Sequence, residues 1–469
     1  MRLIDKYKLA KSVRFTNKTW KNFTNQPWAA GGILLVCVVI AMLLANLPMT
    51  KDLYRNFLDT NITATIQSPL RLDGTRVIDW TFPREMNVEK FINDFLMVVF
   101  FFTVGLEIKR EVVCGELSSV KRALLPVIAA MGGMAAPALI YTLVNHGTMA
   151  ASGWGIPTAT DIAFAVGIMS ILGNRVPTSL KVFLIALAIA DDLGAILVVA
   201  LFYGGSINLL LLSISVIILI GIYFINKSGE KRMSWYLMPA IVVWFLFYYS
   251  GIHSTMSGVV MAFLIPMDAR YKEAYLARRA KEYDVRIRRY SDDEPFPNEM
   301  QRHCLRRLSY ISNNSMGMSY RLEHDLSPWV NYLIMPIFAL ANAGVEIPDL
   351  SYFNIFQYSP EAGSVGLGIF FGLLFGKPIG ITLASFLSIK CKIGEMPVGA
   401  TWSKFFAVAC LGGIGFTMSI FVDTLSFSAF PEFTDQMRAI GKISVLMGSL
   451  SAGILGAVLI RLTAHKIKE

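Results

Sequence analysis

Four charged residues lie inside long apolar stretches of the chain: Asp161, Asp191, Asp192 and Lys377. A charged side chain at the centre of a membrane helix costs about 2.5–3.5 kcal/mol on insertion scales. Such residues normally line a cavity, pair with one another, or carry ions and protons. A buried ion pair that only fixes helix register remains an alternative for one aspartate and the lysine. Three acids against one base leave an acidic excess, which an aqueous cation site explains better.

Asp191 and Asp192 are adjacent in LAIADDLGAIL. Neighbours on a helix point about 100° apart, so we expect the two carboxylates to have separate partners. If both face one cavity, they titrate as a coupled pair. Such a carboxylate holds either a proton or a small hard cation, so an arriving cation releases the proton. Lys377 is the expected partner of one of the two aspartates. This chemistry is ion–proton exchange.

Two apolar stretches are interrupted by helix-breaking residues. Pro157 precedes Asp161 in WGIPTATD, and glycines interrupt LGGIGFTMSIF at 411–421. Two interrupted spans in corresponding positions of two halves point to a transporter site. Half-helix ends carry partial charges of about 0.5, positive at N-termini and negative at C-termini. Facing N-termini would stabilise Asp161, and facing C-termini would stabilise Lys377.

The glycines Gly372, Gly376 and Gly380 surround Lys377 in GLLFGKPIG. Small residues at this spacing let another helix backbone approach closely. We therefore expect a second helix to pack tightly against this one.

The composition places these residues in a membrane protein. Of the 469 residues, 54% are hydrophobic and only 16% are charged, whereas soluble domains carry about 25% charged residues. A helix needs about 20 apolar residues to cross the hydrocarbon core. We therefore predict an all-α polytopic membrane protein with about twelve transmembrane helices. The expected spans are 28–46, 91–112, 123–145, 155–173, 179–203, 207–226, 235–250, 252–267, 328–345, 364–389, 404–423 and 440–461.

Membrane topology explains most of the net charge of +10. Lys and Arg gather on the cytoplasmic side of membrane proteins, and an inside N-terminus places the basic loops there. We predict cytoplasmic N- and C-termini and no nucleic-acid partner. The predicted divisions are a basic N-terminus at 1–27, helices I–VIII at 28–267, a charged insertion at 268–327, helices IX–XII at 328–462 and a tail at 463–469. The five cysteines form no CxxC pair, so no bound metal or disulfide framework is expected.

Two loops carry a structural signal. Residues 66–80, IQSPLRLDGTRVIDW, place Asp73-Gly74 between β-prone runs, which predicts a type I′ hairpin. A surface flap and an edge for pairing with a second protomer both stay open. Loop 268–327 has helix-compatible Arg and Glu spacing, which indicates a cytoplasmic helical insertion.

In these motifs the chain resembles the NhaA family of bacterial sodium/proton antiporters, from about Trp28 to Leu462. Seven motifs in one order carry the resemblance. They are NDFLMVVFFFTVGLEIKRE at 93–111, IPTATDIAFAVG at 156–167, LAIADDLGAI at 187–196, SGIHSTMSGV at 250–259, RLEHDLSPWVNYLIMPIFALANAGV at 321–345, GLLFGKPIGI at 372–381 and LGGIGFTMSIF at 411–421.

The resemblance implies a twelve-helix fold with inverted repeats and two unwound helices that cross near the midplane. It implies electrogenic, pH-regulated exchange of Na⁺ or Li⁺ for protons in the bacterial inner membrane, without a cofactor. Asp192 would be the principal cation ligand, and Asp191 a proton carrier paired with Lys377. Thr160 and Asp161 would belong to the crossing. The residues that it ties to the pH response are Glu107, Arg110, Glu111, Glu323 and His324.

The sequence also departs from the family. Ser327 replaces a second histidine that follows LEH in some members, so the strength and set-point of the pH response do not follow from the resemblance. Loop 268–327 is longer than usual. His324 suits a pH sensor, although an exposed histidine near a helix start is an equal alternative. The hairpin at 66–80 matches the family's dimerisation element in position, so a homodimer is expected.

Two other functions fit parts of the pattern. An intramembrane aspartyl protease also needs two membrane aspartates, but its GxGD signature is absent because Ile189-Ala190-Asp191 precede Asp192. A passive cation channel or a symporter remains possible on the same fold. A channel can select with carbonyl or carboxylate rings, so adjacent aspartates favour coupling to protons. We therefore expect a transporter and no enzyme activity.

Overall fold

The computed structural model describes most of the chain. The described residues are 26, 28–62, 64–67, 79–82, 86–204, 207–289, 297–347, 350–356, 363–427 and 431–463. The basic N-terminus and the C-terminal tail from residue 464 lie outside them. The chain forms two compact units: Met1–Leu96, Cys114–Tyr203 and Asn331–Glu469 make the first, and Met97–Val113 with Gly204–Val330 the second.

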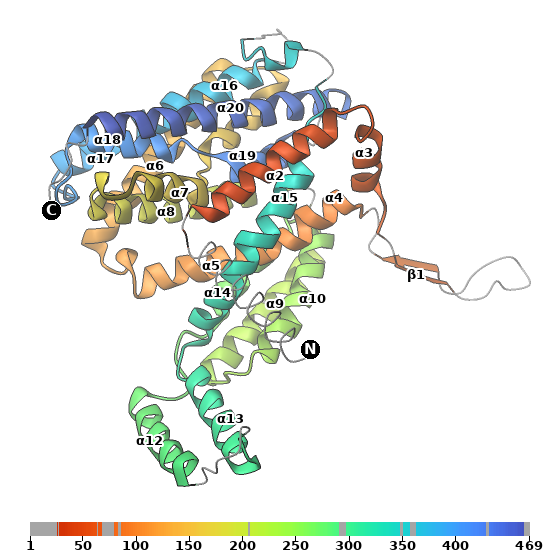
Figure 1. Cartoon of the computed structure of the whole chain (residues 1–469). Coiled ribbons are helices and arrows are strands. Elements are labelled where there is room, and N and C mark those ends of the chain that lie inside the picture. The colour runs from red at the N-terminus through yellow and green to blue at the C-terminus, as the bar shows by residue number, and fades with distance from the viewer. Residues whose placement is uncertain are drawn as a thin grey trace, which may run out of the picture. The chain divides into compact units, whose positions relative to one another are not determined.

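The first unit holds most of the helices (Figure 1). They are α2 (Ala29–Asn46), α3 (Lys51–Asp59), α4 (Val88–Phe91), α6 (Val120–Val144), α7 (Ile162–Leu172), α8 (Thr178–Phe202), α15 (Met335–Asn342), α16 (Val365–Phe371), α17 (Lys377–Lys390), α18 (Trp402–Gly412), α19 (Phe416–Ser426) and α20 (Pro431–Thr463). Short 3₁₀ segments are Glu116–Ser118, Met149–Thr158, Gly173–Arg175 and Leu350–Phe353, and π-helical turns are Ile92–Leu96, Val330–Ile334 and Gly372–Gly376. In this unit α6 packs on α8, α16 and α17, and α20 packs on α16, α18 and α19.

The second unit contains α5 (Met97–Val113), α9 (Leu209–Lys227), α10 (Ser234–Ser250), α11 (Met256–Leu264), α12 (Glu273–Arg289), α13 (Glu299–Asn314) and α14 (Met318–Trp329). Helix α11 packs against α5 because small residues face each other: a β-carbon placed on Gly258 would lie 2.4 Å from the Val98 carbonyl oxygen. Lys109 donates to the carbonyl oxygens of Phe263 and Ile265, which closes the C-terminal end of α11.

The fold is that of an all-α polytopic membrane protein. Among the described residues, seven helices are long and apolar enough to cross a membrane, and two bent helix pairs raise the number to nine. The seven are Ala29–Asn46, Val88–Val113, Lys121–Val144, Thr178–Phe202, Leu209–Lys227, Val365–Lys390 and Gln436–Thr463. Helix α10 has 17 residues and α11 has nine, so the expected spans at 235–250 and 252–267 are short. The total of twelve spans remains a prediction.

The predicted hairpin at 66–80 and the insertion at 268–327 both contain regular secondary structure. Strands β1 (Ala64–Gln67) and β2 (Asp79–Phe82) pair antiparallel, with Ala64 opposite Phe82 and Gln67 opposite Asp79. The predicted turn at Asp73-Gly74 lies outside the described residues, so its type remains a prediction. In the insertion, α12 and α13 lie side by side (Figure 1). Helix α14 begins at Met318, ten residues before the span that we expected at 328–345.

The helix that carries Lys377 makes the tight backbone contact that its glycines predict. A β-carbon placed on Gly380 would lie 2.2 Å from the Gly132 carbonyl oxygen, and one on Gly376 would lie 2.8 Å from the Pro137 α-carbon. Both partners belong to α6. Gly372 instead meets the side chain of Pro157, at 2.8 Å. These contacts hold α17 against α6 and thereby fix the position of Lys377 along α6.

Gly380→Ala tests this contact. The added methyl group forces α6 and α17 apart, and overpacking of this kind costs about 1–3 kcal/mol. We expect a lower melting temperature for the purified protein in detergent. The matched control is Gly221→Ala in α9, where an added β-carbon meets nothing within 4 Å. Equal melting temperatures for the two variants would contradict a tight α6–α17 contact.

Candidate functional site at the crossing of two broken helices

The predicted interruptions are breaks between helix pairs in the first unit. The 3₁₀ segment Met149–Thr158 and α7 bend by 41°, and α18 and α19 bend by 47°. Pro157 cannot donate the hydrogen bond that a continuous helix needs, and glycines flank the second break. The backbone N–H of Asp161 donates to the carbonyl oxygen of Ile414 at 2.6 Å. This bond joins the two breaks directly.

Asp161 lies between two helix N-termini. It is 2% exposed, and its Oδ1 accepts a hydrogen bond from the Phe164 N–H at 3.2 Å, which makes it the N-cap of α7. Its Oδ2 accepts from the backbone N–H of Thr417 at 3.2 Å and from the Thr417 hydroxyl, in the first turn of α19. Unsatisfied N–H groups and the positive ends of both helix dipoles therefore stabilise this carboxylate.

Lys377 lies fully buried beside Asp191. Its ammonium forms an ion pair with Asp191 Oδ2 and donates to the Thr160 hydroxyl. The hydroxyl of Thr160 has one proton, which it donates either to Asp191 Oδ2 or to the Gly412 carbonyl oxygen at 2.9 Å. Gly412 is the last residue of α18. The cation is therefore balanced by a carboxylate and by a helix C-terminus.

Asp192 completes the group of charged residues. It is 2% exposed, lies on α8 next to Asp191, and interacts electrostatically with Lys377. Of the Asp191 oxygens, Oδ1 accepts no hydrogen bond from the residues that the structure describes. The structure thus brings Thr160, Asp161, Asp191, Asp192 and Lys377 into one unit. Carboxylate, hydroxyl and carbonyl oxygens are the ligands that hard cations prefer.

The residues tied to the pH response belong to the second unit. Arg110 forms ion pairs with Glu323 at 2.7 Å and with Glu111 at 3.1 Å. Glu107 interacts electrostatically with these three residues. Burial raises the pKa of Glu323 above its ordinary value, and the charge of Arg110 opposes that rise. These four side chains form one cluster between α5 and α14.

His324 is exposed on α14, and its ring stacks on Tyr320 with centroids 6.3 Å apart. Its role in the pH response stays a prediction.

Two residues with a place at or near the site were missed by the sequence reasoning. Thr417 supplies two of the hydrogen bonds to Asp161. Its signal was a hydroxyl residue two positions after Gly415, the last glycine of the second break. Asp423 is the fifth charged residue with a buried side chain among the described residues, and it is 0% exposed. It escaped notice because it stands at the last position of the expected span 404–423.

Comparisons with known proteins show the family of the chain. The family model described as Na⁺/H⁺ antiporter 1 matches residues 21–460. The chain belongs to this family. It is 40% identical over 450 residues to the Na⁺/H⁺ antiporter NhaA of Sulfurimonas denitrificans, which covers 95% of each protein. It is 41% identical to the Na⁺/H⁺ antiporter NhaA of Wolinella succinogenes, over 96% of this chain and 94% of that protein. It is 37% identical to the Na⁺/H⁺ antiporter NhaA of Christiangramia forsetii, over 97% of this chain and 96% of that protein. Membership of the NhaA family and the apolar helices make the chain a multi-pass membrane protein.

The buried ion pair generates a stability prediction. Lys377→Ala leaves Asp191 buried without its counter-ion, and removing one partner of a buried pair costs about 3–5 kcal/mol. We expect a lower melting temperature in detergent, with partial recovery in the double variant Lys377→Ala/Asp191→Asn. The control is Lys390→Ala, which removes an exposed lysine from the same helix. An unchanged melting temperature for Lys377→Ala would argue against the pairing.

Proposed function

We propose that the chain is a secondary active transporter that exports Na⁺ or Li⁺ from the bacterial cytoplasm in exchange for protons. The observation that carries this proposal is the buried carboxylate pair on α8 with Lys377 at the crossing of two broken helices. Family membership supports sodium/proton antiport. It also places the chain among transporters rather than enzymes, so the protease alternative is dropped.

Competition between a proton and a cation accounts for the exchange. Asp192 is the proposed principal ligand: it holds Na⁺ in one state and a proton in the other. Its carboxylate points about 100° away from that of Asp191 around α8, so the two cannot share one partner in the same geometry. Asp191 is the proposed second proton carrier, and its ion pair with Lys377 opens when it accepts a proton. With more protons moved than sodium ions, the exchange is electrogenic.

The ends of the broken helices stabilise the charged side chains at this site. Asp161 is already stabilised by the N-termini of α7 and α19. Lys377 is adjacent to the C-terminal end of α18 through Thr160. Asp161 and Lys377 therefore compensate fixed dipoles, and Thr160 links Lys377 and the end of α18 to the Asp191 carboxylate on α8. In this proposal they position the site, and the transported ions exchange at Asp191 and Asp192.

The cluster of Glu107, Arg110, Glu111 and Glu323 is the proposed pH-responsive element. The raised pKa of Glu323 brings its titration closer to neutral pH, and protonation removes the charge that Arg110 binds. His324 is a further proposed member.

The membrane arrangement is also a proposal. It has twelve spans with inverted repeats, cytoplasmic termini and an inner-membrane location. The insertion at 268–327 lies in the cytoplasm, and a homodimer forms through the hairpin at 66–80. The antiparallel pairing of β1 and β2 supports a strand pair at this position.

Exchange in everted membrane vesicles tests the function. Added Na⁺ or Li⁺ should discharge an imposed pH gradient, and Asp192→Asn should abolish both Na⁺ binding and the discharge because Asp191 has a different direction and partner. The control is Asp284→Asn, which removes an exposed carboxylate from α12. No discharge by the wild-type protein at any pH between about 6.5 and 9 would contradict antiport. Sodium-dependent proton release retained in Asp192→Asn would overturn the role of Asp192.

A further inference from the structure

Asp423 on α19 is a buried carboxyl group that the site described above does not use. It is fully buried, and neither of its oxygens accepts a hydrogen bond from the residues that the structure describes. A buried polar group without such a bond is costly. The fold nevertheless makes room for it: a β-carbon placed on Gly441 would lie 2.0 Å from Asp423 Oδ1. The carboxylate rests against the bare backbone of α20.

Four titratable side chains surround this carboxylate. Arg438 and Lys442 are one turn apart on α20 and interact electrostatically with it. Tyr141 of α6 and Tyr203, directly after α8, are its other electrostatic neighbours. Both tyrosine hydroxyls donate to backbone carbonyl oxygens at 2.8 Å. The segments Met149–Thr158 and α15 also pack on α19, and their sequences contain no titratable residue.

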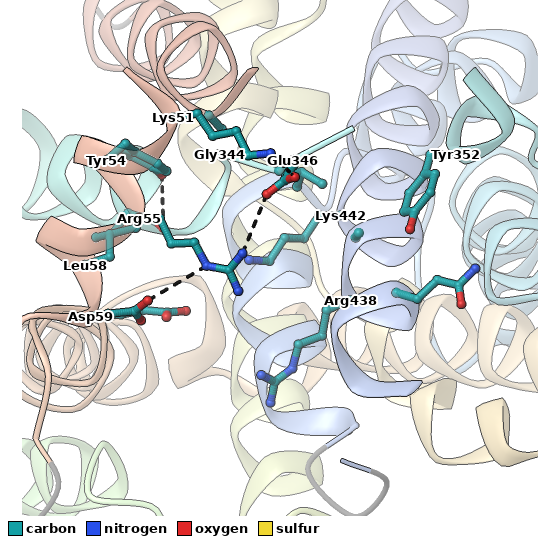
Figure 2. A pocket seen from close by; sticks show the side chains of 16 residues that line it. Lys51, Tyr54, Arg55, Leu58, Asp59, Gly344, Glu346, Tyr352, Arg438 and Lys442 are labelled. Atoms are coloured by element: carbon teal, nitrogen blue, oxygen red, sulfur yellow. Dashed lines mark hydrogen bonds and ion pairs between the residues drawn. The ribbon is translucent and has the colours of Figure 1, made fainter. Parts of the chain in front are cut away.

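The two basic residues connect Asp423 to an open cavity. Arg438 and Lys442 line a cavity of about 460 Å³. Figure 2 shows them on α20, with Lys51 and Arg55 of α3 and Glu346 lining the same cavity. Gly441 lies between Arg438 and Lys442 in sequence, so the carboxylate that touches it lies directly behind the cavity wall. In the proposed orientation this cavity is on the outer side of the membrane.

A row of polar groups leads from Asp423 toward the broken helices. Ser419 is one turn before it on α19, and its buried hydroxyl has no hydrogen-bond partner among the described residues. A β-carbon placed on Gly415 would lie 2.2 Å from the Ser419 oxygen. Ser449 of α20 accepts from the Gly415 N–H at 3.2 Å. Asp423 and Ser419 are one helix turn apart, about 5.4 Å along the axis of α19, and a single water molecule can bridge polar groups at such a separation.

We propose that Asp423 is a further proton-binding carboxyl group, which takes protons from the cavity at Arg438 and Lys442 and passes them along the α19–α20 interface to the broken helices. A hydronium ion in the cavity gives its proton to the carboxylate and becomes water. The carboxylic acid then returns to carboxylate by donating the proton to a water molecule beside Ser419. The inference rests on the proposed antiport, because it supplies that reaction with its outer proton path.

A purely structural ion pair is the competing explanation. In that case Asp423 would only tie α19 to Arg438 and Lys442, and any effect of its loss would follow stability. A proton path predicts a different result. Proton delivery limits the rate where protons are scarce, so the loss should grow with rising pH.

The experiment compares exchange rates in everted vesicles across a series of luminal pH values, because the cavity on the outer side of the membrane faces the lumen. At the alkaline end, near pH 9, Asp423→Asn should slow Na⁺-driven exchange about tenfold, because a positioned proton carrier contributes at least that much. At the acid end the rate should approach that of the wild-type protein, and the KM for Na⁺ should change less than twofold. Asp423→Glu should keep the wild-type profile. Ser419→Ala should shift the profile in the same direction as Asp423→Asn.

Two matched variants control the comparison. Asp59→Asn removes an exposed carboxylate that lines the cavity and pairs with Arg55 at 4.0 Å. Ser444→Ala removes a buried hydroxyl of α20 that is satisfied by the Ile440 carbonyl oxygen. Both should keep the wild-type profile. A wild-type profile for Asp423→Asn would overturn the proposal. So would a rate loss that is equal at all pH values and accompanies a lower melting temperature.

A second readout does not depend on transport. Infrared spectra of the purified protein should show a carboxylic acid C=O band that grows on acidification and is missing in Asp423→Asn. Identical spectra for the two proteins would overturn the proposal even if exchange is observed. Wild-type vesicles that show no exchange would instead contradict the proposed antiport, while the infrared band still decides whether Asp423 binds a proton.

Discussion

The energetic cost of a charge inside the membrane is the constraint on which the rest of the structure depends. Each such residue costs about 2.5–3.5 kcal/mol at a helix centre unless other groups compensate it. Two helix N-termini compensate Asp161, and the Asp191 carboxylate with the end of α18 compensates Lys377. A continuous helix exposes no free N–H or C=O groups at its middle. The breaks beside Pro157 and the glycines of 411–421 therefore provide the free N–H and C=O groups that stabilise Asp161 and Lys377.

Close helix packing serves the same constraint. Helix α17 lies directly on α6, with glycines at the contact, and α6 also packs on α8, which carries Asp191. Lys377 on α17 can therefore reach Asp191. The backbone bond from Asp161 to Ile414 holds the two breaks at one position. Rigid surroundings of this kind keep a site in its geometry, as the proposed exchange of a proton for a cation at one carboxylate requires. In the proposed exchange, protons and cations would bind and leave without a rearrangement of these helix contacts.

Much of this arrangement was predictable because charge, proline and glycine are rare inside apolar spans. Asp161, Asp191, Asp192 and Lys377 stood out by composition alone, and the close approach at Gly376 and Gly380 followed from their spacing. Family membership is confirmed by the matches over nearly the whole chain. The roles of the individual site residues stay predictions.

The remaining features depend on contacts that spacing does not encode. Which hydroxyl serves Asp161 depends on how two distant segments cross, so Thr417 was missed. Asp423 lies at a predicted span end, where a charge normally reaches water, but α19 packs against α20 at Gly441 and the side chain is buried. Helix α14 begins before its apolar run because its first turns are amphipathic and pack on α5.

Competition between protons and sodium ions for one site is the central claim, and sodium binding measured across pH tests it most directly. Isothermal titration calorimetry of the purified protein gives the Kd for Na⁺ without any need for transport. Where binding releases one proton, the Kd should rise about tenfold for each unit of decreasing pH. A Kd for Na⁺ that stays constant between about pH 6.5 and 9 would contradict competition at the carboxylates of α8.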